Sequence, residues 1–142
     1  MLTADLMVGF PGETDEDFLD TMRFVREAGL LDAHVFAYSK REGTPAADYP
    51  DQIDERVKHE RSATLIKECS EVRESVLSNV VALGEPLRVI FETKKGGLYY
   101  GHSDSYIEVY AEGEGKCGDV AFVQPERTEN GAIYGKIIKQ DN

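Results

Sequence analysis

The sequence is poor in cysteine, and its two cysteines are far apart. Cys69 and Cys117 have no second thiol and no histidine near them at the spacing of metal ligands. The sequence therefore predicts no metal site, and a disulfide bond is not expected in a reducing compartment. Cys69 is predicted to fill the apolar side of a helix and Cys117 to lie in a turn, where neither needs a chemical role.

Long apolar runs are also absent. No stretch approaches the roughly 20 residues that span a bilayer, and the segment MLTADLMVGF has neither the basic start nor the cleavage site of a secretory signal. With 41% hydrophobic and 30% charged residues, the chain has the composition of a folded protein rather than a disordered one. These features predict a soluble cytoplasmic protein that does not insert into a membrane.

Positive charge is scarce as well, since 16 Lys and Arg face 27 Asp and Glu and give a net charge of −11. Residues 1–80 hold 9 of these cations against 17 acidic residues, whereas residues 81–142 hold 7 against 10. Proteins that bind nucleic acids strongly usually present a basic surface, because neutralising phosphates releases counterions. The overall charge argues against strong autonomous binding, but a local patch in the less acidic second half stays open.

The first fifty residues carry the pattern of two parallel strands joined by a helix. Residues 4–9 and 33–38 are predicted strands, and between them apolar residues recur at helical spacing until Gly29. The turn GFPGET precedes this helix, with Thr14 as its predicted cap and acidic residues in its first turn. Such an order predicts a right-handed βαβ unit. Because two parallel strands are not a stable sheet, we expect the unit to be a remnant of a larger protein.

The pattern changes twice after residue 52. Asp54 is a possible cap for a long charged helix that runs to about Ser78. After Glu85, short alternating segments separated by Gly-rich turns predict a small antiparallel barrel of five strands. The predicted strands are 86–93, 98–102, 106–112, 119–125 and 132–139. The fold class is therefore α+β, with a βαβ remnant at 1–52, a linker helix at 53–79 and a barrel at 80–142.

Four segments carry a resemblance to a known family. In order and spacing, MVGFPGETDEDF, HVFAYSKREGTPAA, GHSDSYIEVYAEG and CGDVAFV resemble the C-terminal portion of the radical S-adenosylmethionine methylthiotransferases. The resemblance covers nearly the whole chain and is greatest to the branch that acts on threonylcarbamoyl-adenosine beside the tRNA anticodon. The isopentenyladenosine and ribosomal-protein branches are near relatives. The resemblance implies that residues 1–52 end a (β/α) barrel and that residues 80–142 form a TRAM domain, an OB-like barrel that contacts RNA.

The resemblance also implies the cofactors of a full-length enzyme, which are S-adenosylmethionine and two 4Fe-4S clusters. The family binds one cluster through a CxxxCxxC loop, and this sequence has no such loop. Without thiolate ligands no cluster can deliver the electron that cleaves S-adenosylmethionine. We therefore expect no cofactor and no catalysis in this chain alone. It is interpreted as a C-terminal fragment that needs the missing N-terminal portion of the same enzyme and contributes weak tRNA binding.

Two loops are the candidate contacts for S-adenosylmethionine. In the family, loops at the C-terminal ends of the barrel strands face the active site, and the resemblance places GFPGET and YSKREGT there. Glycines would let the backbone approach the cofactor, and the helix that follows would favour an anionic group. The candidate residues are Gly9, Pro11, Gly12, Glu13, Ser39, Arg41 and Thr44. For Arg41, a solvated loop residue without a role is the alternative.

The candidate RNA surface of the barrel combines cations with aromatic rings on which bases can stack. It consists of Arg88, Lys94, Lys95, Tyr99, Tyr100, His102, Lys136 and Lys139. Because side chains alternate between the faces of a strand, Tyr99 or Tyr100, together with Tyr106, is expected to point into the core. Gly101 matches the TRAM pattern but is interpreted as a turn residue.

Two other functions stay open. The chain could be a stand-alone, non-catalytic RNA-binding module whose βαβ part is a docking surface, or a protein-interaction adaptor without an RNA role. A CxxxCxxC motif upstream in the same reading frame would favour the enzyme over both. In addition, the unpaired edges and apolar side chains of the first two strands predict that two copies associate through residues 1–50.

Overall fold

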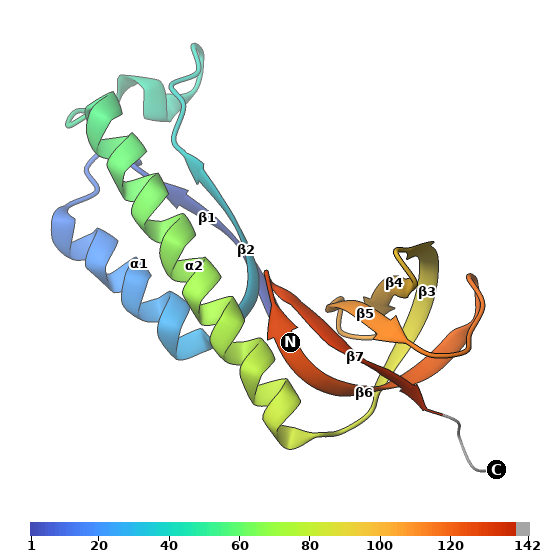
Figure 1. Ribbon diagram of the computed structural model, residues 1–142. Coiled ribbons are helices and arrows are strands. Elements are labelled where there is room, and N and C mark those ends of the chain that lie inside the picture. Colours follow the sequence, from blue (N-terminus) through green and yellow to red (C-terminus); the bar gives the residue numbers. More distant parts are fainter. Residues whose placement is uncertain (139–142) are drawn as a thin grey trace. The chain divides into compact units, whose positions relative to one another are not determined.

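The computed structural model describes residues 1–138, which divide into two compact units whose boundary in the chain falls within the second helix. The first unit is Met1–Arg73, and the second begins at Glu74. The elements are β1 (Leu2–Val8), α1 (Asp15–Ala28), β2 (Leu30–Ala37), a short 3-10 helix η1 (Pro45–Asp48), α2 (Glu55–Leu83), β3 (Leu87–Lys95), β4 (Leu98–Ser103), β5 (Glu108–Glu112), β6 (Val120–Glu129) and β7 (Ala132–Ile138) (Figure 1). Within the described residues, no helix has the length and apolar character needed to cross a membrane.

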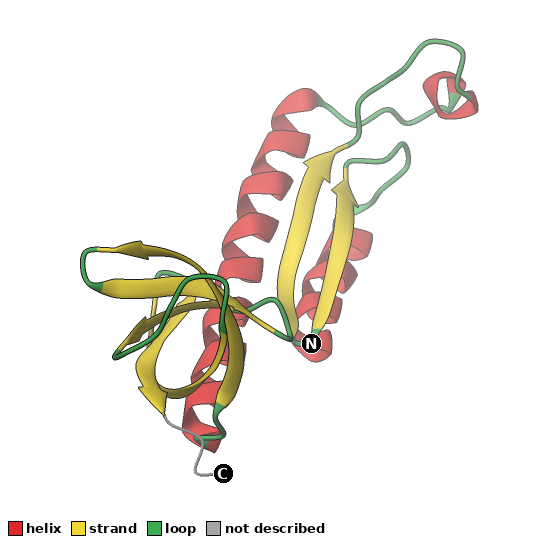
Figure 2. Ribbon diagram, turned by 90° about the vertical axis from the view of Figure 1, so that its right-hand side faces the viewer, coloured by secondary structure: helices red, strands yellow, loops and turns green. Residues whose placement is uncertain are grey.

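The first unit contains the predicted parallel strands, with α1 between them in the chain. Figure 2 shows β1 and β2 running in the same direction, with the loops that follow them leaving from the same edge. The Thr14 hydroxyl accepts a hydrogen bond from the Asp17 N–H at 3.1 Å, and the Asp17 carboxylate accepts one from the Thr14 N–H at 2.8 Å. The Thr14 N–H and the Thr14 hydroxyl both donate to the Asp17 carboxylate, each at 2.8 Å, and hold the pKa of Asp17 below its ordinary value. The helix ends at Gly29, whose φ is 60°, so both predicted ends of α1 are confirmed.

The core of the first unit lies between the two strands and both helices. Val8 of β1, Val25 of α1 and Leu65 of α2 are fully buried in it. The first part of α2 is therefore a packed layer of this unit. On the other face of the strands, the register partners Met7 and Phe36 are each 44% exposed. One face of this two-stranded sheet is thus covered and the other carries apolar side chains in solvent.

The second unit is a closed barrel with the strand order β3-β4-β5-β7-β6. The predicted number of strands is confirmed, but the prediction that all neighbours are antiparallel is wrong, because β5 and β7 are parallel. A closed ring with an odd number of strands cannot alternate direction all the way round, so at least one pair must be parallel. Preceding the barrel, α2 extends to Leu83 instead of Ser78 and is followed by Gly84, whose φ is 66°.

Two residues of the barrel differ from the sequence expectation. Gly101 lies inside β4 rather than in a turn, and a Cβ atom there would lie 1.8 Å from the carbonyl oxygen of Ile90 on β3. Tyr106, expected in the core, is 81% exposed. It occupies the turn between β4 and β5 with φ of 60°. Side chains in this turn do not alternate between the two faces of the sheet as they do in a strand. Cys117 is exposed in a turn, as predicted.

Candidate functional sites

The loops after β1 and β2 lie side by side in the first unit and contain all seven candidate cofactor residues. The N–H of Gly12 in the first loop donates to the carbonyl oxygen of Asp51 in the second at 3.0 Å. At the start of the second loop, the Tyr38 N–H donates to the Val8 carbonyl oxygen at 2.8 Å. Both loops therefore share the carboxyl edge of the parallel strands, which is where α/β folds bind ligands.

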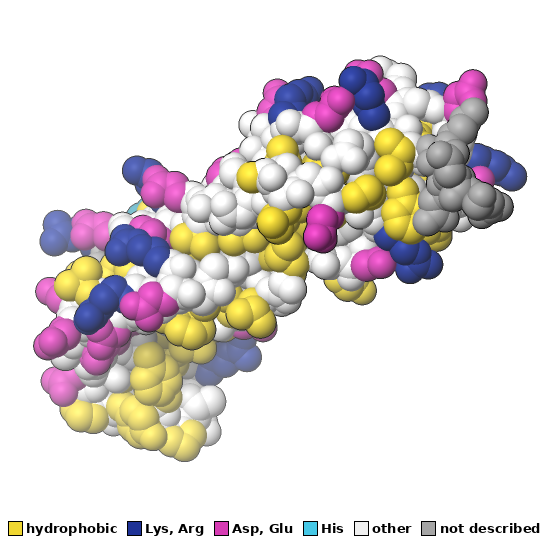
Figure 3. Space-filling view, turned by 90° about the horizontal axis from the view of Figure 1, so that it is seen from below, with side chains coloured by type: hydrophobic (Ala, Val, Ile, Leu, Met, Phe, Trp, Pro, Cys, Tyr) yellow, Lys and Arg dark blue, Asp and Glu magenta, His cyan; other side chains and the backbone are white. Residues whose placement is uncertain are grey.

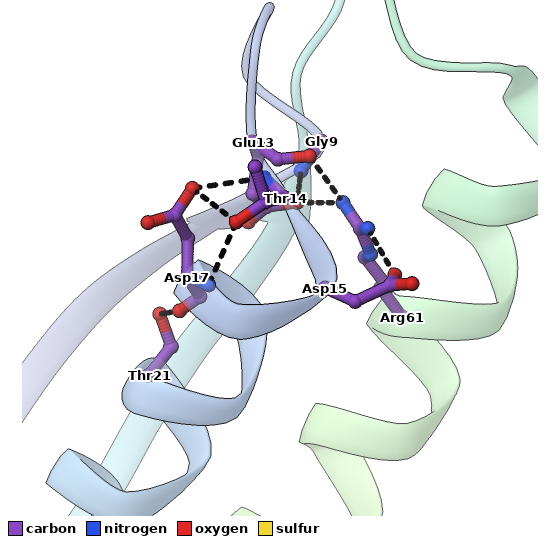
Figure 4. Close-up of polar contacts among 7 residues, drawn as sticks. All are labelled: Gly9, Glu13, Thr14, Asp15, Asp17, Thr21 and Arg61. Carbon is purple, nitrogen blue, oxygen red and sulfur yellow. Dashed lines mark hydrogen bonds and ion pairs between the residues drawn. The ribbon is translucent and has the colours of Figure 1, made fainter.

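The Glu13 carboxylate is engaged within the protein (Figure 4). Its Oε2 atom accepts from the Gly9 N–H at 2.7 Å and from Arg61 Nη1 at 2.6 Å, and Arg61 Nη2 donates to Asp15 at 2.7 Å. The side chains of Arg61 and Glu13 are only 9% and 11% exposed. Burial lowers the pKa of Arg61, but the hydrogen bonds to Asp15 and Glu13 outweigh it and raise that pKa above its ordinary value. Glu13 thus fixes the shape of the loop.

Position 9 has no room for a side chain, because Lys58 of α2 packs against it. The φ of Gly9 is +70°, and a Cβ atom there would lie 2.2 Å from Cγ of Lys58. Lys58 is itself only 4% exposed, and its Nζ donates to the Tyr38 carbonyl oxygen at 3.1 Å. Two cations of α2, Lys58 and Arg61, therefore hold both loops at their bases.

Sequence reasoning missed Lys58 and Arg61, because it treated the polar face of α2 as solvated. Arg61 lies one helical turn before the buried Leu65, and Lys58 lies two turns before it. Both are on the continuation of its apolar stripe. That spacing was the available signal. A Lys or Arg on the apolar stripe of a packed helix is expected to be buried and to form hydrogen bonds or ion pairs within the protein.

The remaining loop candidates face solvent. Ser39, Arg41 and Thr44 are exposed, and the Thr44 hydroxyl donates to the Arg41 carbonyl oxygen at 2.7 Å. Gly12 has φ of +86° and open space where a side chain would stand. Pro11 is half-buried. Gly12, Ser39, Arg41 and Thr44 are consequently the candidates that a ligand could contact.

In the second unit, Tyr99 and Tyr100 point to opposite faces of β4. Tyr99 is buried, with its ring centroid 5.2 Å from that of Phe91, and its hydroxyl donates to the Gly115 carbonyl oxygen. Lys94 lies over the Tyr99 ring, 4.3 Å from the centroid, and donates to its hydroxyl at 3.2 Å. Tyr100 is half-buried on the outer face. Of the two rings, only that of Tyr100 is partly accessible on the outer face of the barrel.

Several candidate cations of the barrel are paired with acidic side chains. Arg88 Nη1 lies 3.3 Å from Asp104 Oδ1, and Lys136 Nζ lies 2.8 Å from Glu126 Oε1. The His102 ring is 2.6 Å from Glu92. Among the candidate cations within residues 1–138, Lys94 and Lys95 are those without an acidic partner; Lys139 lies outside the described residues. On the face that Figure 3 shows, Lys and Arg stand among Asp and Glu rather than in one continuous patch.

Three half-buried tyrosines form a row across the outer face of the barrel, here called the tyrosine row. Tyr100 of β4, Tyr110 of β5 and Tyr134 of β7 are register partners. Their ring centroids are 5.0 Å and 4.9 Å apart, and Tyr110 and Tyr134 are stacked at 14°. Arg127 of β6, the register partner of Tyr134, lies 4.2 Å from that ring. Sequence reasoning found only Tyr100, since the row depends on the parallel pairing of β5 with β7.

Comparison with known proteins shows that the chain is similar over nearly its whole length to one class of proteins, the methylthiotransferases. This confirms the resemblance of the four segments. Threonylcarbamoyladenosine tRNA methylthiotransferase MtaB of Bacillus subtilis is 41% identical over 147 residues, which cover 99% of this chain and 33% of that protein.

Other relatives act on different substrates, according to their names. A tRNA-2-methylthio-N(6)-dimethylallyladenosine synthase of Caldicellulosiruptor saccharolyticus is 40% identical over 96% of this chain and 29% of that protein. The ribosomal protein methylthiotransferase RimO of Trichlorobacter lovleyi is 47% identical over 64% of this chain and 20% of that protein. No family model matches the chain. The chain spans about a third or less of the length of these relatives.

Proposed function

We propose that this chain is the C-terminal portion of a cytoplasmic, tRNA-modifying radical S-adenosylmethionine methylthiotransferase, most similar to the threonylcarbamoyladenosine branch. One observation carries the proposal, namely that 99% of the chain aligns with 33% of such an enzyme. In the full-length protein, the first unit completes the catalytic barrel and the second unit is a TRAM domain that binds tRNA. The paired loops at the carboxyl edge of β1 and β2 support the first role.

The two loops would contribute to the S-adenosylmethionine site in different ways. Gly12, Ser39, Arg41 and Thr44 face solvent and are the proposed contacts, with Arg41 as the group that can pair with a carboxylate. Glu13 sets the loop shape through Gly9 and Arg61. Bound S-adenosylmethionine would supply the radical chemistry of such an enzyme.

The iron–sulfur clusters would belong to the N-terminal portion. Cys69 is half-buried in a helix and Cys117 stands alone in a turn, and the described residues include no group of His, Cys, Asp or Glu side chains suited to a metal. These residues do not fit a cluster, which needs several thiolates. We propose that the chain by itself holds no cluster and does not catalyse; iron and sulfide analysis of the purified chain tests this.

For the isolated chain, we predict a homodimer through residues 1–50. The uncovered sheet face with Met7 and Phe36 would otherwise pack against the rest of the parent barrel, and within residues 1–138 the outer edges of β1 and β2 are unpaired. Light scattering at tens of micromolar is expected to give the dimer mass for the chain and the monomer mass for Met7→Lys/Phe36→Glu. A wild-type chain that scatters as a monomer contradicts this prediction.

The chain should bind tRNA weakly through a few phosphates. Lys94 and Lys95, which have no acidic partner within residues 1–138, should carry most of this contact. Lys94→Ala/Lys95→Ala is therefore expected to reduce the slope of log K against log salt by about 2. Fluorescence anisotropy with labelled tRNA at several salt concentrations measures the slope. Lys40→Ala/Lys116→Ala removes the same charge elsewhere and should leave the slope unchanged.

Different results would favour the other two functions. A chain that binds no tRNA at low salt would support the protein-interaction adaptor. Tight binding that salt does not weaken would contradict the electrostatic basis of the proposal and fit a specialised stand-alone RNA module. Unchanged binding by Lys94→Ala/Lys95→Ala would move the phosphate contacts to another surface.

A further inference from the structure

The tyrosine row borders a small hollow in the surface of the barrel. Four strands contribute to this hollow, which we call the barrel hollow. It is lined chiefly by Leu98, Tyr110, Glu112, Glu126, Arg127 and Tyr134. The hollow thus brings together aromatic rings, a guanidinium and two carboxylates. None of the residues that line it belongs to the candidate RNA surface predicted from the sequence.

We infer that the barrel hollow and the tyrosine row hold an unpaired nucleobase of tRNA that carries an exocyclic amino group. This inference rests on the proposed function and deepens it. It assigns recognition of a base to this surface, whereas Lys94 and Lys95 would contact phosphates.

The rings supply the contact area. Tyr100, Tyr110 and Tyr134 are each half-buried, so part of every ring remains accessible. Tyr100 is tilted by 46° against Tyr110, and Tyr110 and Tyr134 are nearly parallel. Because Tyr110 and Tyr134 are stacked, their edges can contact a ligand, and aromatic edges attract the π-face of a base. Successive ring centroids lie 5.0 Å and 4.9 Å apart, so the row extends over about two strand spacings.

The charges around the hollow suit a base better than a phosphate. Glu112 and Glu126 would repel a phosphate, but a carboxylate accepts hydrogen bonds from exocyclic amino groups. Glu126 accepts a hydrogen bond from Lys136 at 2.8 Å and retains further acceptor positions. Arg127 lies over the Tyr134 ring, and its Nη1 pairs with Glu129 Oε2 at 3.1 Å; its remaining N–H groups can donate to ring nitrogens or carbonyl oxygens. On this assignment, Glu112 and Glu126 contribute to RNA binding by accepting hydrogen bonds from the base.

The row could instead serve only the fold, as a clamp on the parallel β5–β7 pair. Cross-strand aromatic pairs stabilise sheets, and Tyr110 and Tyr134 join the two strands directly. Glu126 and Arg127 also pair with Lys136 and Glu129, but Glu112 has no ion pair within residues 1–138, and a clamp does not require a carboxylate there. The two roles differ in what a substitution changes, since a clamp affects stability and a base site affects RNA selectivity.

The experiment uses the whole chain and three single-stranded oligoribonucleotides of equal length, oligo(A), oligo(C) and oligo(U), at moderate salt. Uracil lacks an exocyclic amino group, so oligo(A) and oligo(C) are expected to bind about tenfold more tightly than oligo(U). Glu112→Gln, which keeps the shape, should reduce this preference. Tyr134→Leu should weaken oligo(A) binding about tenfold, because one base loses its aromatic partner.

The matched control is Tyr106→Leu, which removes a tyrosine that is 81% exposed and lies outside the row. It should leave binding of all three oligonucleotides unchanged, and circular dichroism of each variant confirms that the barrel is folded. Equal binding of oligo(U) and oligo(A) would overturn the inference, and so would wild-type binding by folded Tyr134→Leu. In either case, binding of tRNA by the wild-type chain would still support the proposed function. Loss of binding to both tRNA and oligonucleotides in the wild-type chain would count against the proposed function itself.

Discussion

Replacing Gly101 by alanine should prevent the barrel from closing. The added Cβ atom would lie 1.8 Å from the carbonyl oxygen and 2.8 Å from the carbonyl carbon of Ile90. Both are backbone atoms of β3, which is held in the ladder between β4 and β6, so neither can move aside without breaking hydrogen bonds. We expect the free energy of unfolding to fall by about 4 kcal/mol or more. Urea unfolding of the whole chain, followed by near-ultraviolet circular dichroism of the tyrosines, measures the loss.

A second glycine and a control sharpen this test. Gly135→Ala should behave like Gly101→Ala, because its Cβ atom would lie 2.1 Å from the Gln124 carbonyl oxygen on β6. Gly97 has φ of +89° and open space around its missing side chain, so Gly97→Ala should cost only the backbone strain, about 1 to 3 kcal/mol. Equal unfolding midpoints for Gly101→Ala and Gly97→Ala would show that the close approach of β3 and β4 does not need glycine.

Arg61→Met should be the most damaging change in the loop site. Removing the guanidinium leaves the Glu13 carboxylate, whose side chain is 11% exposed, without its charged partner. Breaking a buried ion pair from one side typically costs about 3 to 5 kcal/mol, because the remaining charge stays desolvated. Urea unfolding of the chain measures this cost. Arg23→Met is the control, since Arg23 and Asp20 are both 61% exposed and a surface pair contributes at most about 1 kcal/mol.

A double variant tests the origin of the effect. If the cost of Arg61→Met comes from the charge left on Glu13, then adding Glu13→Gln should recover part of the lost stability, so the two changes are not additive. Strict additivity would mean that Arg61 stabilises the loops through Asp15 or through packing instead. Either result shows which contact shapes the loop between β1 and α1.

Features that depend on neighbours in the sequence could be predicted. Thr14 and Gly29 delimit α1 because capping and the left-handed end of a helix are local chemistry. The parallel pairing of β1 and β2 followed from the short loops around that helix. The existence of the barrel strands followed from their alternation and their turns.

Features that depend on distant partners could not. The parallel β5–β7 pair brings Tyr110 beside Tyr134 through closure of the ring, and the sequence does not encode that register locally. Arg61 and Glu13 are separated by 48 positions and meet only when α2 packs on the first unit. Lys58 is buried against Gly9 for the same reason. The parts of both candidate sites that sequence reasoning missed are therefore the long-range ones.

The most direct test of the proposed function is a chimera in which this chain replaces the matching third of the Bacillus subtilis threonylcarbamoyladenosine tRNA methylthiotransferase. The chimera is produced in a strain that lacks its own enzyme, and nucleosides from digested tRNA are analysed by mass spectrometry. The proposal predicts that methylthiolated threonylcarbamoyladenosine appears. A chimera that is folded and holds its iron–sulfur clusters, yet forms none of this nucleoside, would contradict it.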